Sequence, residues 1–208
     1  MSTASSRTPT LRPATLEDLL ALPEESRRHE VLDGELVEKE AAGFGHGLAQ
    51  NRLGRWTGPF DRAPGGPQGP GGWWIVTDVT VQLALHQIVR PDVAGWRRER
   101  LPHPPRTFPV PLRPDWVCEI MGDGDARRRD GLQKRRIYGE AGVPHYWLLD
   151  LERERLTVLR LTHGGYVEVL EAGPKDRVVA EPFESLLLPI GLLFGEDVNP
   201  ADLPAPRT

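Results

Sequence analysis

Three ionisable side chains, Asp92, Glu119 and Lys134, lie within 43 positions of one another, each where the pattern calls for an apolar residue. Two carboxylates on adjacent strands can hold Mg²⁺ through oxygen ligands while water fills the remaining positions. A metal lowers the pKa of a bound water, and a nearby ammonium can orient that water or stabilise charge on a phosphoryl oxygen. Together, these residue types form a minimal set for phosphodiester hydrolysis.

Glu119 belongs to an expected strand at 116–121, where alternation places Trp116, Cys118 and Ile120 on one face. The other face carries Val117, Glu119 and Met121, so both faces read as buried. Burial of an unpaired carboxylate costs on the order of several kcal/mol of folding free energy, unless the group pairs with a cation or binds a metal.

Lys134 belongs to an expected helix at 126–141. At about 100° per residue, Lys134 lies near the centre of the core-facing sector of roughly 120°. Lysine is rare in this chain, where only Lys39, Lys134 and Lys175 stand among 26 basic residues. Its compact ammonium suits close contact with one oxygen or water. The other members of this sector are Ala126, Asp130, Ile137, Tyr138 and Ala141.

Each residue also has a structural interpretation. Asp92 could cap a turn after Pro91, Glu119 could pair with an arginine, and Lys134 could extend to solvent or bridge to Asp130. For any one residue this interpretation is the stronger. For all three together the chemical interpretation is favoured.

The elements around these residues predict a mixed α/β fold. Helices are expected at 16–22, 46–57 and 126–141, and a tight hairpin at 31–38 turns at Asp33-Gly34. Strands are expected at 74–85, 89–96, 116–121, 146–151, 156–161 and 166–170. The segments at 58–72 and 101–114, rich in glycine or proline, are expected to be irregular. The expected architecture is a single domain with a central mixed β-sheet flanked by helices.

Composition narrows the class of protein. The 208 residues suit one domain, expected at 14–198 between a disordered leader at 1–13 and a tail at 199–208. The single cysteine, Cys118, excludes an internal disulfide, and no apolar run is long enough for a signal peptide or a membrane span. A cytoplasmic protein without a membrane partner is expected. The six histidines show no zinc-ligand spacing, and no phosphate-loop or nucleophile-elbow motif is present.

Charge is unevenly distributed. The net charge of −4 argues against a basic coat over the whole chain. Between Arg97 and Arg136, however, eleven arginine or lysine residues stand against six acidic ones. This local surplus fits contact with a phosphate backbone, although an arginine-rich coding bias would give the same pattern.

Several motifs resemble the Uma-type putative restriction endonuclease family of the PD-(D/E)xK nuclease superfamily. They are Val89-Arg90-Pro91-Asp92-Val93, Val117-Cys118-Glu119-Ile120, and the segment from Asp130 through Lys134, Tyr138 and Gly142-Val143-Pro144 to Tyr146-Trp147 and Asp150. The resemblance extends upstream to Leu16-Glu17-Asp18-Leu19 and to 30–35, and covers roughly residues 15 to 195. The Gly-Val-Pro-x-Tyr-Trp run after a lysine-bearing helix is its most specific part.

This resemblance implies a restriction-endonuclease-like α/β core, in which the central mixed β-sheet is flanked by helices. It also implies Mg²⁺-dependent endonuclease cleavage of DNA phosphodiester bonds, with Mn²⁺ as an alternative metal and RNA left open as a substrate. Asp92 and Glu119 would be the metal ligands, Lys134 the catalytic lysine, and Glu30 an outer acidic ligand. Asp130 and Tyr138 would be supporting residues, and His46 a capping or DNA-contact residue. A homodimer is expected because cutting both strands usually takes two sites.

Two departures support an alternative hypothesis. After Glu119 the family commonly has a Leu-Ser-Pro-Ser-like turn, but this chain has Met121-Gly122-Asp123-Gly124-Asp125, and His145 replaces an acidic residue before Tyr146. The extra acids could add a metal ligand or repel a phosphate backbone. The alternative is therefore an inactive nuclease-fold module for nucleic-acid binding or protein interaction.

Overall fold

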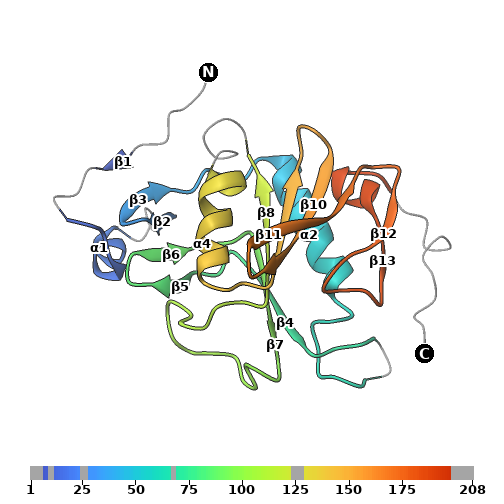
Figure 1. The fold of residues 1–208 in the computed structure, drawn as a ribbon, viewed down its shortest axis with the longest axis horizontal. Coiled ribbons are helices and arrows are strands. Elements are labelled where there is room, and N and C mark those ends of the chain that lie inside the picture. Colours follow the sequence, from blue (N-terminus) through green and yellow to red (C-terminus); the bar gives the residue numbers. More distant parts are fainter. Residues whose placement is uncertain (1–6, 9–11, 24–27, 67–68, 123–128, 198–208) are drawn as a thin grey trace.

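The computed structural model describes residues 7–8, 12–23, 28–66, 69–122 and 129–197. Its larger sheet has six strands in the order β11-β10-β9-β8-β7-β4 (Figure 1). Only the β8–β9 pair is parallel within this sheet, and the chain between these two strands contains the lysine-bearing helix. The bounds are β4 (Trp73–Thr77), β7 (Val93–Arg97), β8 (Trp116–Met121), β9 (His145–Asp150), β10 (Arg155–Thr162) and β11 (Gly165–Ala172).

A smaller sheet has the order β1-β3-β2-β6-β5. The predicted hairpin is confirmed, since β2 and β3 pair across Asp33 and Gly34, which have φ of +55° and +78°. Such left-handed angles at both central residues are typical of a two-residue hairpin turn. The bounds are β1 (Arg7–Thr8), β2 (His29–Leu32), β3 (Glu35–Glu38), β5 (Val81–Ala84) and β6 (Gln87–Val89).

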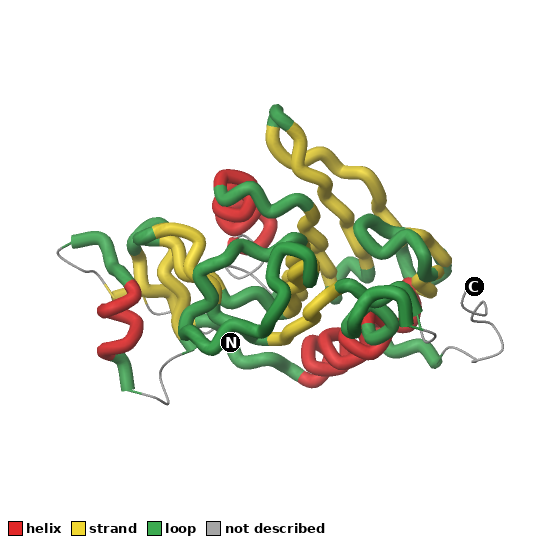
Figure 2. The backbone as a smooth tube through the Cα atoms, turned by 90° about the horizontal axis from the view of Figure 1, so that it is seen from below, coloured by secondary structure: helices red, strands yellow, loops and turns green. Residues whose placement is uncertain are grey.

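Helices cover both faces of the larger sheet, as Figure 2 shows. Helix α2 (Phe44–Thr57) packs against one face, in a core that includes Trp116, Cys118 and Ile120. A π-helical segment, η2 (Arg129–Lys134), leads into α4 (Arg135–Glu140), which packs on the face that carries Val117. The two predicted faces of the 116–121 strand are therefore confirmed.

The remaining elements extend this frame. Helix α1 (Leu16–Ala21) begins with a capping box between Thr15 and Asp18 and packs on the smaller sheet. At the other end of the described chain, β12 (Arg177–Val179), β13 (Leu187–Pro189) and the 3₁₀ helix η3 (Ile190–Phe194) follow β11. No helix in the described ranges is long and apolar enough to cross a membrane.

Two strand predictions were wrong because the chain changes sheets within them. The expected strand at 74–85 breaks at Asp78, whose φ is +51°, so that β4 and β5 lie in different sheets. The expected strand at 89–96 breaks at 90–92, which links β6 of the smaller sheet to β7 of the larger one. Alternation reports burial along each strand but carries no information about which sheet the strand joins.

The predicted helix at 126–141 has a different geometry at its start. Its described part begins at Arg129 with a π-helical segment and becomes α-helical at Arg135. The start at 126 and the Asp123/Asp125 turn lie outside the described residues. The mixed α/β fold, with a central mixed sheet flanked by helices, is as predicted.

Candidate functional site

The four predicted site residues Glu30, Asp92, Glu119 and Lys134 line one cavity of about 320 Å³. Glu30 comes from β2 of the smaller sheet and Glu119 from β8 of the larger sheet. Asp92 lies in the link between the two sheets, and Lys134 ends η2 above β8. The cavity therefore opens where the sheets meet, beside the carboxyl ends of β8 and β9, an edge where α/β proteins commonly bind ligands.

Lys134 bridges two of the carboxylates. Its Nζ lies 2.9 Å from Glu30 Oε1 and 3.0 Å from Glu119 Oε1, and all three side chains are about 98% buried or more. The backbone N–H of Arg90 also donates to Glu30 Oε1, at 2.6 Å. Lys134 is therefore buried rather than extended to solvent, and it pairs with Glu119.

Tyr138 lies one helical turn after Lys134 and contacts the same carboxylate, that of Glu119. Its hydroxyl donates to Glu119 Oε1 at 2.6 Å. Burial, followed by the nearby charge of Glu119, raises the pKa of Tyr138 well above its ordinary value, so the hydroxyl stays a donor. The side chain of Asp130, the other residue expected to be supportive, is outside the described part of the structure.

Asp92 is held from two sides. The backbone N–H of Ile120 donates to its Oδ2 at 2.6 Å, while Lys39 Nζ lies 2.6 Å and His46 Nε2 3.1 Å from its Oδ1. Burial alone would raise the pKa of Asp92, but the Lys39 charge and the contact with His46 outweigh it and hold the pKa well below the usual value. Asp92 is therefore a buried carboxylate anion.

Sequence reasoning missed Lys39 and assigned His46 elsewhere. Lys39 follows β3, and two of the three lysines of the chain therefore meet in this cavity. The rarity that singled out Lys134 applied equally to Lys39, but no periodic pattern surrounds a residue just after a strand. His46, expected to cap or contact DNA, contacts the Asp92 carboxylate from the first turn of α2.

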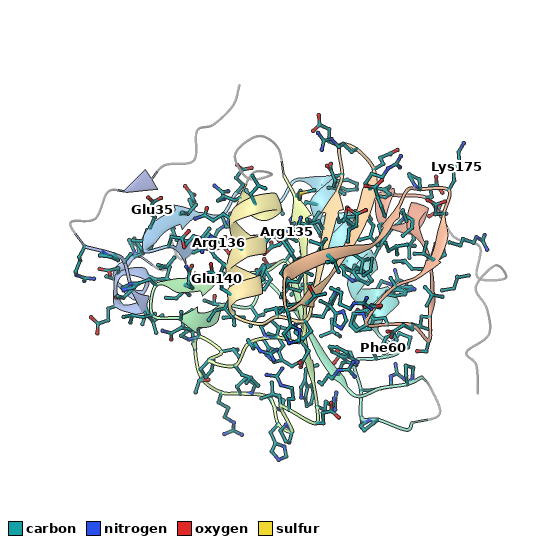
Figure 3. All side chains as sticks on the ribbon, in the orientation of Figure 1. Glu35, Phe60, Arg135, Arg136, Glu140 and Lys175 are labelled. Atoms are coloured by element: carbon teal, nitrogen blue, oxygen red, sulfur yellow. The ribbon has the colours of Figure 1, made fainter. Side chains whose placement is uncertain are left out.

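The described arginines between 97 and 136 do not gather at this cavity. Strand β7 leads away from Asp92, so Arg97 lies at the opposite end of the sheet, where Arg100 and Arg113 pair with Asp115. Figure 1 shows the loops of this end below β7 and β4. Arg136 on α4, labelled in Figure 3 with Glu140, binds Glu140 on the same helix and Asp33 in the hairpin turn. Of the described arginines in this range, Arg129 alone lines the cavity.

The residues fit a hydrated divalent cation. Carboxylate oxygens are the ligands that Mg²⁺ prefers, and this ion is commonly held by one or two carboxylates while it keeps several waters. Asp92 and Glu119 line a cavity of about 320 Å³, which leaves room for those waters. Within the described ranges, no three His, Cys, Asp or Glu residues are grouped to hold a metal by themselves. The donor set therefore fits an open site of two carboxylates completed by water.

Comparison with known proteins identifies the family. The model of the family Uma2, described as "Putative restriction endonuclease", matches residues 16–191, and this range contains all four predicted site residues. The chain belongs to the Uma2 family. The family predicted from the motifs is therefore confirmed.

A solved structure supports the Uma2 fold. It is described as "a putative nuclease belonging to DUF820 from Anabaena variabilis ATCC 29413" and superposes with a TM-score of 0.65 at 21% sequence identity. The match covers 88% of this chain and 98% of the other. The comparison with curated proteins gave no significant match.

Proposed function

We propose that this Uma2 chain is a metal-dependent endonuclease that hydrolyses DNA phosphodiester bonds. Membership of a family described as restriction endonucleases supports the nucleic-acid substrate. The single observation that carries the chemistry is the position of Lys134 Nζ, 3.0 Å from Glu119 and 2.9 Å from Glu30, in the cavity that Asp92 also lines.

In this proposal Asp92 and Glu119 hold Mg²⁺ or Mn²⁺, which supplies an activated water and stabilises charge on the phosphate. Lys134 positions the attacking water and balances the negative charge that develops on the phosphoryl group. Glu30 is a second carboxylate partner of Lys134 and helps to keep the ammonium at the cavity. Cleavage of both strands of a duplex would use two copies of the site, and therefore a homodimer.

A second candidate is a nuclease-fold module that binds nucleic acid without cutting it. One observation favours it: Lys39 and His46 both contact Asp92, the residue that the proposal assigns to the metal. An Asp92 carboxylate permanently neutralised by these groups would leave a binding surface without metal chemistry.

The test is cleavage of supercoiled plasmid with Mg²⁺ or Mn²⁺, by the natural chain beside Asp92→Asn and Lys134→Met. Lys175→Met and Asp197→Asn are the matched controls. Figure 3 shows Lys175 well away from α4, and the Asp197 side chain is fully exposed. Circular dichroism of each variant verifies folding, because removing one partner of a buried ion pair can cost about 3–5 kcal/mol.

Metal-dependent nicking that disappears in both site variants but persists in both controls is expected. Cleavage that survives Lys134→Met in a folded protein would contradict the role given to that residue. A folded natural chain that binds DNA but does not nick it with either metal would favour the binding module.

A further inference from the structure

Lys39 is the one cavity-lining lysine that the proposed hydrolysis does not use. Its Nζ donates to the carbonyl oxygen of Arg90 at 2.6 Å and lies 2.6 Å from Asp92 Oδ1. The side chain is only 17% exposed. With the Asp92 carboxylate and the Arg90 carbonyl oxygen as its partners, Lys39 is a mostly buried ammonium group.

This cation occupies the oxygen that a metal would need. Asp92 Oδ2 already accepts the backbone N–H of Ile120 at 2.6 Å, so that oxygen is engaged by the strand itself. The other oxygen, Oδ1, faces Lys39 and His46. Magnesium binds carboxylate oxygen at about 2.0–2.1 Å. An ammonium and a divalent cation on one oxygen would repel each other strongly in a buried setting.

A second carboxylate stands beside Lys39. Asp78 Oδ1 lies 3.7 Å from the same Nζ. Asp78 is held by Gln50, whose amide donates to Asp78 Oδ2 at 2.9 Å and to the backbone carbonyl of Asp92 at 2.8 Å. The ammonium can thus leave Asp92 for Asp78 and still keep an anionic partner.

From this geometry we propose that Lys39 is an internal counter-ion of the metal site. It neutralises Asp92 in the metal-free protein and moves to Asp78 when a divalent cation binds, and this exchange sets the affinity for the metal. The inference rests on the metal-dependent function proposed above. It assigns Lys39 as a positioning residue, because Lys39 acts through Asp92.

The test measures metal binding without DNA. Isothermal titration with Mn²⁺ gives the affinity of the natural chain, Lys39→Met and Asp78→Asn, and thermal unfolding in EDTA gives the stability of each. Lys39→Met keeps an unbranched side chain of similar length but removes the charge. It is expected to bind Mn²⁺ at least tenfold more tightly and to melt at a lower temperature in EDTA. Asp78→Asn is expected to bind Mn²⁺ more weakly, because Lys39 loses its second partner.

Two further variants separate charge from packing. Lys175→Met removes an exposed lysine and is expected to leave both measurements unchanged. Lys39→Arg keeps the charge and is expected to return the Mn²⁺ affinity toward that of the natural chain. A merely structural role for Lys39 would lower stability and metal affinity together, which is the opposite of the expected pair of changes.

A folded Lys39→Met that binds Mn²⁺ no more tightly than the natural chain overturns the inference. If the natural chain still nicks plasmid with metal in that case, the proposed function stands without it. If neither the natural chain nor Lys39→Met binds Mn²⁺, both proposals fail. Binding by Lys39→Met but not by the natural chain supports the inference, since the counter-ion then excludes the metal.

Discussion

Glu119 Oε1 accepts two hydrogen bonds, one from the Lys134 ammonium and one from the Tyr138 hydroxyl. Two donors from one helical segment therefore fix the orientation of a carboxylate on the neighbouring strand. At this scale the site is a set of buried charges, each balanced by a group from a different element. Such networks hold their members in place because an unpaired buried charge is costly.

Tyr138→Phe tests this positioning. The ring stays in its core contacts with Tyr146, while the bond to Glu119 disappears. Loss of a hydrogen bond to a charged group is expected to lower the free energy of unfolding by about 1.5–3 kcal/mol. Metal-dependent nicking is expected to fall by about 10–100-fold, the range found when partners of metal ligands are removed. Chemical denaturation and plasmid cleavage measure the two effects, and unchanged cleavage would contradict a positioning role.

Single residues were predictable where they broke a pattern. Glu119 and Lys134 stood out because their neighbours were apolar at the spacing of a strand or a helix. Asp92 was found through its proline and the apolar residues around it, and Glu30 only through resemblance to the family. Lys39 could not be found in this way, since it follows a strand end where no period constrains the residue type.

At the scale of elements, the hairpin of β2 and β3 is tied to the lysine-bearing helix. Asp33, in the hairpin turn, accepts bonds from Arg136 at 2.6 and 2.7 Å and from Gln133 at 2.8 Å. Glu30 of the same hairpin binds Lys134. The hairpin therefore meets η2 and α4 at two places, one exposed and one buried, which fixes the side of the cavity that Glu30 provides.

Asp33→Asn tests the exposed contact of the hairpin with Arg136 and Gln133. The turn itself is expected to be preserved, because asparagine tolerates a positive φ. Burial would raise the pKa of Asp33, but the bonds from Arg136, Gln133 and Gln87 outweigh it and lower the pKa. The resulting stabilisation is present above the unfolded pKa of about 3.9 and is lost as the pH falls through the lower folded value.

The side chain of Asp33 is 38% exposed, so solvent screening limits the effect. The natural chain is expected to exceed Asp33→Asn by less than about 1 kcal/mol at pH 7. This difference is expected to shrink below pH about 4. Urea unfolding across the pH range measures it, with Glu168→Gln, which changes an exposed acid on β11, as a control. A constant difference down to the lowest pH would contradict the pKa argument.

The elements themselves were predictable where their periods were clear, as for 46–57 and 116–121. The errors fell at Asp78 and at 90–92, where the chain passes between sheets. A strand that continues its alternation across such a break looks uninterrupted in the sequence. Pairing partners are set by contacts between distant residues, which local periodicity does not contain.

In the whole molecule, the two ends of the larger sheet differ in how deeply their ion pairs are buried. At the cavity end both partners of the Lys134 ion pairs are buried, while at the opposite end the partly exposed Arg100 and Arg113 pair with Asp115. The sequence shows a surplus of arginine between 97 and 136, and the structure distributes the described members of this group over several surfaces. The density of charge along the sequence does not reveal this distribution, because β7 places Arg97, and the arginines that follow it in the chain, at the end of the sheet away from the site.

Two exposed arginines at opposite ends test where nucleic acid binds. Arg153 lies just after Leu151 and Glu152, which line the cavity, and its side chain is 74% exposed. Arg106 is exposed in the irregular segment at the other end. Arg153→Ala is expected to weaken DNA binding and to reduce the slope of affinity against salt by about one, while Arg106→Ala leaves both unchanged. Fluorescence anisotropy at several salt concentrations measures this, and the reverse result would place the DNA at the other end.

Cys118 is the only cysteine of the chain, and it lies buried in β8 directly before Glu119. Burial raises the pKa of its thiol, and the nearby charges of Asp92 and Glu119 raise it further. A thiol-specific dye can therefore reach it only when the strand beneath the cavity opens. The rate of labelling at Cys118 therefore measures how often this strand opens, and no cysteine has to be introduced for the measurement. A ligand that binds only the closed form makes opening less frequent. A metal held by Asp92 and Glu119 would therefore lower the rate of labelling at Cys118. The size of this decrease would report the fraction of protein that holds the metal.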